Sequence, residues 1–209
     1  MTLDETFTSL VARYSDDRQQ GMNLWKELVE LYSETSRYYH NLNHLEHLLS
    51  ELIPYKYELN DIDAVLFALY YHDAVYNVHS KDNEEKSAAL AEERMISLRV
   101  PKVRIKAALH NIMATKAHIL SENADTNLFT DADLSILGHS WDPYSTYQKQ
   151  IRQEYSIYPD NLYNPGRRKV LEHFLAMPRI FKTLPFYDKY EHQARVNIRR
   201  ELELLEIRK

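Results

Sequence analysis

A histidine and an aspartate interrupt one of the most apolar stretches of this sequence, residues 66–76. Read as a helix, the stretch places Asp73 on an apolar stripe formed by Ile62, Leu66, Leu69 and Tyr76. An unpaired buried carboxylate is costly, so such a group normally becomes neutral or binds a cation. Because His72 precedes Asp73 at the edge of the same stripe, we expect that cation to be a metal ion.

Two further polar residues are expected on inward helix faces. Asn41 or Asn43 could cap a helix whose stripe contains Leu45, Leu48, Leu49 and Leu52, and His44 lies at the border of that stripe. Later in the chain, helical spacing groups Asp133 with Ile136 and Leu137 and turns Asp131 to the opposite side. The pattern therefore predicts that Asp133 is the inward aspartate.

Together these residues make a mixed nitrogen and oxygen ligand set. The chain has ten histidines and no cysteine, so imidazole and carboxylate are its good ligands for transition metals. Two imidazoles and two carboxylates suit Mn, Fe, Co, Ni or Zn, and Mg also stays open. Four ligands of a six-coordinate ion leave positions for water or substrate, which is what catalysis requires.

The elements that must position these residues are expected to be helices. Three Gly and seven Pro in 209 residues leave little turn chemistry for an all-β fold, and 44% hydrophobic residues are enough for a sizeable core. No Gly/Ser-rich linker or internal repeat divides the chain, so we expect one all-α domain over 1–209. The expected helices lie at about 3–14, 21–34, from Asn41 or Asn43 past 52, from 61 through the His-Asp pair, 82–98, from 101, around 128–138, 143–155, 165–177 and 186–207.

Charge and the N-terminal residues bear on partners and location. A net charge of −5 provides no general attraction to nucleic acid or anionic lipid. The N-terminus lacks a basic segment followed by an apolar core, and no apolar run approaches membrane-spanning length. We therefore expect a cytoplasmic protein that binds neither a nucleic-acid polymer nor a membrane. The apolar face of the last helix is compatible with a homo-oligomer.

Four short segments, in order, resemble the HD superfamily of metal-dependent phosphohydrolases, in particular a bacterial branch of uncharacterised predicted hydrolases. They are residues 39–44, 71–76, 82–88 and 131–138. The resemblance implies an HD-type helical bundle with a metal site between central helices, core motifs at about 37–140 and C-terminal helices 143–207 packed on that core. Carried over residue by residue, it implies that His44, His72, Asp73 and Asp133 are the metal ligands.

Each ligand has an alternative interpretation. His44 could be a core histidine, with His40 one turn earlier as the ligand, and Asp73 could pair with an arginine. If Thr130 capped the last motif's helix, Asp133 would be its third residue. Asp131 is the reserve carboxylate. Since some HD proteins bind a second metal through additional histidines, His118 is a further reserve ligand, although a surface histidine is the alternative.

Residues near the doublet are candidates for catalysis and substrate binding. Asp73, Glu84 or Glu85 could act as a general base, with a solvated helix start as the alternative for the two glutamates. Arg37, just before the first motif, and Lys86 could bind a phosphate group. Each could equally be an ordinary solvated charge.

The resemblance implies hydrolysis of a nucleotide or another small phosphorylated metabolite by metal-activated water. Phosphomonoesterase and phosphodiesterase activity are both compatible with it. One alternative is a di-iron HD-type oxygenase, which needs extra ligands such as His118. A second is a catalytically silent HD-type binding module. A ferritin-like di-iron site is excluded, because no histidine has a glutamate three residues before it.

Overall fold

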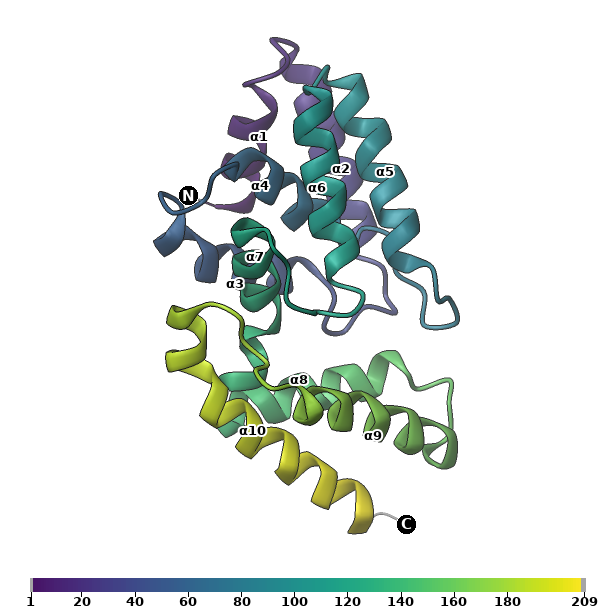
Figure 1. Ribbon diagram of the computed structural model, residues 1–209. Helices are drawn as coiled ribbons and strands as arrows, with labels where there is room; N and C mark the ends of the chain where they lie inside the picture. The colour runs from purple at the N-terminus through teal and green to yellow at the C-terminus, as the bar shows by residue number, and fades with distance from the viewer. Residues whose placement is uncertain (1, 208–209) are drawn as a thin grey trace. The chain divides into compact units, whose positions relative to one another are not determined.

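The computed structural model describes residues 2–207, and none of these residues is in a β-strand. Figure 1 shows helices joined by short loops, so the predicted all-α class is confirmed. The described residues fall into two compact units, one ending at Thr130 and the other beginning at Asp131. The single domain over 1–209 stays a prediction.

The first unit contains six helices and most of a seventh. They are α1 (Leu3–Val11), α2 (Arg18–Tyr32), α3 (Leu42–Leu52) with a 3₁₀ turn η1 (Ile53–Tyr55), α4 (Ile62–Tyr71), α5 (Asn83–Ser97), α6 (Lys102–Ala114) and α7 (Ala124–Leu134). Polar caps fix several starts: Asn41 accepts from the Asn43 N–H at α3, and Asp61 accepts from the Ala64 N–H at α4. The predicted cap Asn41 is thus confirmed.

Helix α4 is the centre of this unit. Every residue from Asp63 to Tyr71 is buried, and α4 packs against α1, α3, α5 and α6. Such a helix is apolar all round, unlike a surface helix with one apolar stripe. Two buried tyrosine hydroxyls tie α4 to its neighbours: Tyr70 donates to the Leu3 carbonyl at 2.8 Å, and Tyr32 of α2 donates to the Tyr70 carbonyl at 3.1 Å.

The end of α4 differs from the sequence prediction. The helix stops at Tyr71 with His72 as its C-cap, so Asp73 lies beyond the helix and not on its apolar stripe. Two contacts replace the helical hydrogen bonds here. The Ala74 N–H donates to the Tyr71 carbonyl, and the Arg37 guanidinium donates to the Asp73 carbonyl. The doublet therefore sits at a buried helix end, a place where backbone groups need partners.

Helix α7 also differs from the prediction. It begins at Ala124, where Asn123 accepts from the Asp125 and Thr126 N–H groups. Thr130 lies in mid-helix, so its interpretation as an N-cap is wrong. Helix α7 ends at Leu134 and continues as the 3₁₀ turn η2 (Ser135–Gly138).

The expectation that Asp131 faces outward is wrong, and the change of period also removes the basis for grouping Asp133 with the residues that follow it. A 3₁₀ turn has three residues per turn and breaks the 3.6-residue spacing used to group Asp133 with Ile136 and Leu137. Asp131 is fully buried, whereas Asp133 is only partly buried. Asp131 accepts from the Lys182 and Thr183 N–H groups and from the Thr183 hydroxyl.

The second unit contains the last residues of α7, the turn η2, and helices α8 (Trp141–Glu154), α9 (Asp160–Ala176) and α10 (Leu184–Ile207). Helix α10 packs against α9 and η2. A buried ion pair joins α9 to α10: the Arg167 guanidinium donates to both Glu201 oxygens, at 2.8 and 3.0 Å. Tyr144 of α8 donates to the same carboxylate, so the buried charge is fully engaged.

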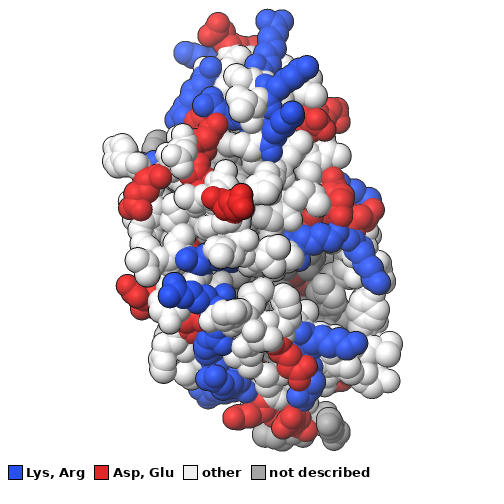
Figure 2. Space-filling view, in the orientation of Figure 1, with Lys and Arg blue, Asp and Glu red and all other residues white. Residues whose placement is uncertain are grey.

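The visible surface carries mixed charge. In Figure 2, basic and acidic side chains are interspersed over the face shown and do not form one broad basic area. This distribution agrees with the net charge of −5. Between residues 2 and 207, no helix has the length and apolar character needed to cross a bilayer.

Candidate metal centre

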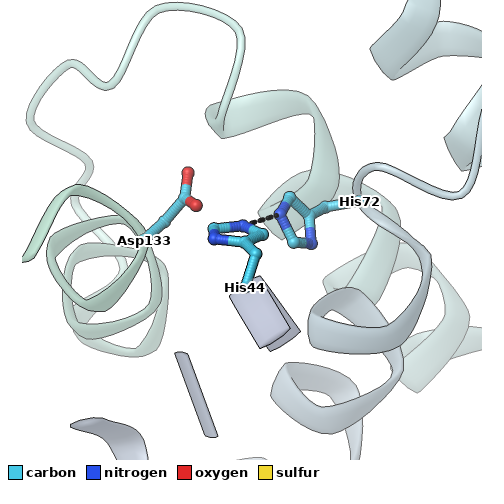
Figure 3. Close-up of side chains that lie close together, drawn as sticks. All are labelled: His44, His72 and Asp133. Carbon is cyan, nitrogen blue, oxygen red and sulfur yellow. Dashed lines mark hydrogen bonds between the residues drawn. The ribbon is translucent and has the colours of Figure 1, made fainter. Parts of the chain in front are cut away.

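Two imidazoles from different helices meet inside the first unit. His44, in the first turn of α3, is 4% exposed, and His72, at the end of α4, is 1% exposed. Their Nε2 atoms lie 3.1 Å apart, and Figure 3 shows the two rings turned toward each other. Burial of His44 agrees with its predicted position on the inward side of its helix.

The carboxylate of Asp73 approaches the same point. Its Oδ2 atom lies 3.1 Å from His72 Nε2 and 3.8 Å from His44 Nε2, and the side chain is 18% exposed. Burial favours a higher pKa for Asp73, but the imidazoles of His72, His40 and His44 outweigh it and hold the pKa below its usual range. Asp73 is therefore kept ionised, the form in which a carboxylate binds metal.

These residues fit a metal ion by their chemistry. Two ligand atoms that are each about 2.1 Å from one ion lie about 3 Å apart in octahedral geometry. The 3.1 Å separations are close to this value, and the 3.8 Å separation is longer. His72 Nδ1 faces the Leu69 carbonyl at 3.0 Å, so when a metal ion displaces the Nε2 proton the remaining proton lies on Nδ1 and Nε2 becomes the lone-pair donor.

His40 is the reserve ligand that the fold brings beside this cluster. It is half-buried, its ring centroid lies 5.9 Å from that of His44, and its ring lies against that of Tyr76 with centroids 4.3 Å apart and the planes tilted by 30°. It also contributes to the low pKa of Asp73. We therefore treat His40, His44, His72 and Asp73 as the candidate metal centre of the first unit.

Asp133 provides the fourth predicted ligand and belongs to the second unit. His44, His72 and Asp133, drawn in Figure 3, are residue types that together could hold a metal ion. The reserve Asp131 is already used, because its carboxylate binds backbone groups of residues 182 and 183. Of the two aspartates, Asp133 is therefore the better candidate, and its role as a ligand stays a prediction.

Arg37 has a different role from the one predicted. Its side chain is 1% exposed, and its guanidinium donates to the carbonyls of His40, Asp73 and Ala74. A guanidinium used in this way is not free to bind a substrate phosphate. These contacts correct the predicted phosphate-binding role and indicate that Arg37 supports the backbone around the cluster.

The other predicted polar residues lie in ordinary surface interactions. Glu85 forms an ion pair with Lys116, whose ammonium also lies 3.9 Å from Glu84. Lys86 pairs with Asp82 at 2.9 Å, one turn earlier. These contacts match the solvated helix start, so we assign no catalytic role to the glutamates and no phosphate-binding role to Lys86.

His118, the reserve residue for a second metal, follows α6 and is half-buried. Its φ is +52°, in the left-handed region where histidine is enriched among non-glycine residues, and its N–H donates to the Ala114 carbonyl. This contact lies beyond the end of α6 at Ala114, and the role of His118 as a reserve ligand stays a prediction.

The sequence interpretation missed Ser87, which is completely buried beside the cluster's backbone. Its hydroxyl donates to the Val75 carbonyl and accepts from the Val75 N–H. The signal was present in the third motif, residues 82–88, where a small polar residue on an otherwise inward position needs a partner.

No protein-family model matches the chain, and neither a curated protein nor a solved structure shows significant similarity to it. The resemblance to the HD superfamily thus rests on the sequence motifs alone.

Proposed function

We propose that this protein is a metal-dependent hydrolase of the HD type that acts on phosphoesters. The observation that carries the proposal is the convergence of His44 Nε2, His72 Nε2 and Asp73 Oδ2 at a buried helix end. Imidazole nitrogens are good donors for transition metals, and the ionised carboxylate offsets the charge of a cation. The motifs shared with the HD superfamily support the same chemistry.

The ligand set that we propose is His44, His72, Asp73 and Asp133. A divalent ion bound there would lower the pKa of a water molecule and stabilise negative charge on a phosphoryl group. Its identity is open among Mn, Fe, Co, Ni, Zn and Mg. His72 would be held in orientation by its Nδ1 contact with Leu69.

The residues of the cluster have distinct tasks in this proposal. The Asp73 carboxylate, which is ionised and partly exposed, would be the general base that accepts the proton of the attacking water. His40 and Tyr76 form a half-buried pair of rings with centroids 4.3 Å apart, and we propose that they contact the substrate. We propose a nucleotide or another small phosphorylated metabolite as substrate.

Phosphate release from a panel of nucleotides and sugar phosphates tests the proposal. Purified wild-type protein and Asp73→Ala are each reconstituted with one divalent metal at a time. We expect activity in the wild type and a loss of about 100-fold or more in Asp73→Ala, because a general base typically contributes about 10²- to 10⁴-fold. Equal activity in both proteins, or none in either, would refute the proposal.

Metal content separates this proposal from its alternatives. One divalent ion with phosphatase activity supports the hydrolase, and two irons per chain with oxygen-dependent activity would support the oxygenase. Protein that binds no metal would support the binding module.

A further inference from the structure

The segment that carries the doublet leaves α4 with backbone groups that no helix satisfies. Asp73, Ala74 and Val75 follow directly after the helix end, and Ala74 is completely buried. Buried carbonyl and N–H groups without partners are costly, so side chains must supply them. In this protein two residues do so, one on each side of the segment.

Arg37 supplies hydrogen bonds on one side of this segment. One guanidinium nitrogen donates to the Asp73 carbonyl at 2.6 Å and to the His40 carbonyl at 3.1 Å, and the other donates to the Ala74 carbonyl at 2.9 Å. Arg37 thereby joins the two chain segments that supply the imidazoles and the carboxylate of the cluster. It fixes the peptide planes on which the orientation of Asp73 depends.

The arginine itself is held by aromatic rings. Its guanidinium carbon lies 5.0 Å from the Tyr32 ring centroid and 5.5 Å from that of Tyr76. A planar guanidinium can stack on aromatic rings and bind several carbonyls in fixed directions, whereas the ammonium of lysine is a compact charge on a flexible stem. The position therefore requires arginine and not merely a positive charge.

Ser87 of α5 supplies hydrogen bonds on the other side of the segment 73–75. Its hydroxyl accepts from the Val75 N–H at 3.0 Å and donates to the Val75 carbonyl at 3.2 Å. Since Ser87 is completely buried, these two bonds do not compete with solvent at its side chain. Consecutive residues 73–75 are thus tied to α5 and to the segment before α3.

We propose that Arg37 and Ser87 are positioning residues that preorganise Asp73 for metal binding. This inference rests on the proposed function, since it concerns the geometry of the same centre. It also explains why a buried arginine and a buried serine stand within or beside the motifs although neither supplies a metal ligand. Neither residue touches the reacting atoms.

Equilibrium binding of Co²⁺ to the purified full-length chain tests this inference, with affinity and the Co²⁺ absorption spectrum as readouts. For Arg37→Lys we expect affinity to fall about 10- to 100-fold, as is typical when residues that support metal ligands are changed. Ser87→Ala should reduce affinity less, because Arg37 still holds two carbonyls. Both variants should shift the absorption spectrum, which reports the ligand geometry.

Two control variants lie elsewhere in the first unit. Arg94→Lys breaks the paired contacts of Arg94 with Glu27, and Ser97→Ala removes a hydrogen bond to the Arg94 carbonyl. Both should lower the thermal unfolding midpoint without changing Co²⁺ affinity or spectrum. This result separates a positioning role from general stability.

The outcomes distinguish the two proposals. If the wild type binds Co²⁺ and folded Arg37→Lys and Ser87→Ala bind it equally well with the same spectrum, the positioning role is wrong and the metal centre stands. Should Arg37→Lys not fold, Ser87→Ala decides alone. Wild-type protein without Co²⁺ affinity would overturn both the metal centre and the positioning role.

Discussion

His72 Nδ1 lies 3.0 Å from the carbonyl oxygen of Leu69, one helical turn earlier in α4. A backbone carbonyl only accepts hydrogen bonds, so the proton of a neutral imidazole belongs on Nδ1, and Nε2 carries a lone pair. That Nε2 atom is the one directed at His44 and Asp73. The end of a buried helix thus fixes both the tautomer and the direction of the ligand.

The two aspartates of the last motif should respond differently to substitution by asparagine. Asp131→Asn weakens charge-assisted bonds to the backbone of residues 182 and 183, so the free energy of unfolding should fall by about 2–3 kcal/mol. Asp133→Asn should instead lower metal affinity with little change in stability. Urea unfolding and metal titration of both variants check this. Loss of metal affinity in folded Asp131→Asn alone would identify Asp131 as the ligand.

Gly138 should be intolerant of a side chain. A Cβ atom placed on Gly138 would lie 2.4 Å from Tyr190 Cβ and 2.7 Å from the Tyr190 carbonyl oxygen, within the backbone contact between η2 and α10. Gly138→Ala should therefore destabilise the protein by about 2–3 kcal/mol or more. Chemical denaturation provides the measurement.

Gly166 offers the matched control for Gly138. It lies within α9, and a Cβ atom there would meet nothing within 4 Å. Gly166→Ala should stabilise the protein by about 0.5–1 kcal/mol, because alanine has the better helix propensity. Equal effects of the two substitutions would contradict the close approach at Gly138.

Replacement of Arg99 by glycine should increase the stability of the protein. Its φ is +60°, and the Arg99 and Val100 N–H groups bind the carbonyls of Ile96 and Met95, a Schellman arrangement that closes α5. Because glycine adopts this conformation without steric cost, Arg99→Gly should stabilise by up to about 1 kcal/mol. Lys106→Gly, at an exposed position inside α6, should destabilise by about as much in the same urea titration. If Arg99→Gly destabilised the protein as Lys106→Gly does, the interpretation of Arg99 as a strained helix-terminating residue would be wrong.

Tyr14 should make stability depend on pH in alkaline solution. Burial and its hydrogen bond to Asp63 raise the pKa of Tyr14 from 10.0 to about 12. Between these values the unfolded chain loses a proton that the folded chain keeps, so stability falls as pH rises from about 10 to about 12. Below pH 10 the contribution is fully present.

Urea unfolding across this pH range, compared with Tyr14→Phe, isolates the effect, because contributions from the other tyrosines cancel in the difference. The stability advantage of the wild type should shrink with rising pH. A constant difference would show that Tyr14 titrates alike in both states.

The sequence predicted the helical class and the residues of the first unit's cluster, because both depend on patterns that are local in sequence. Burial of His44 followed from its place next to the stripe of α3, and the His-Asp doublet was recognised by its apolar context. These signals hold wherever a helix keeps its regular period.

The errors arose where the backbone leaves that period. Asp73 lies beyond the end of α4, and the turn η2 upsets the spacing after Asp133. The role of Arg37 depends on carbonyls of residues more than thirty positions away, a contact that no local pattern reveals. Hydrogen bonds between a side chain and backbone groups far away in the sequence could not be predicted from the sequence alone.

Calorimetric titration of the metal-free chain with a divalent metal tests the central claim most directly. We expect binding by the wild type, a loss of affinity of more than about 100-fold in His72→Ala, and unchanged affinity in His110→Ala, whose histidine lies exposed on α6. A wild type without affinity for any of Mn²⁺, Fe²⁺, Co²⁺, Ni²⁺, Zn²⁺ and Mg²⁺, or a folded His72→Ala that binds as tightly as the wild type, would contradict the metal centre.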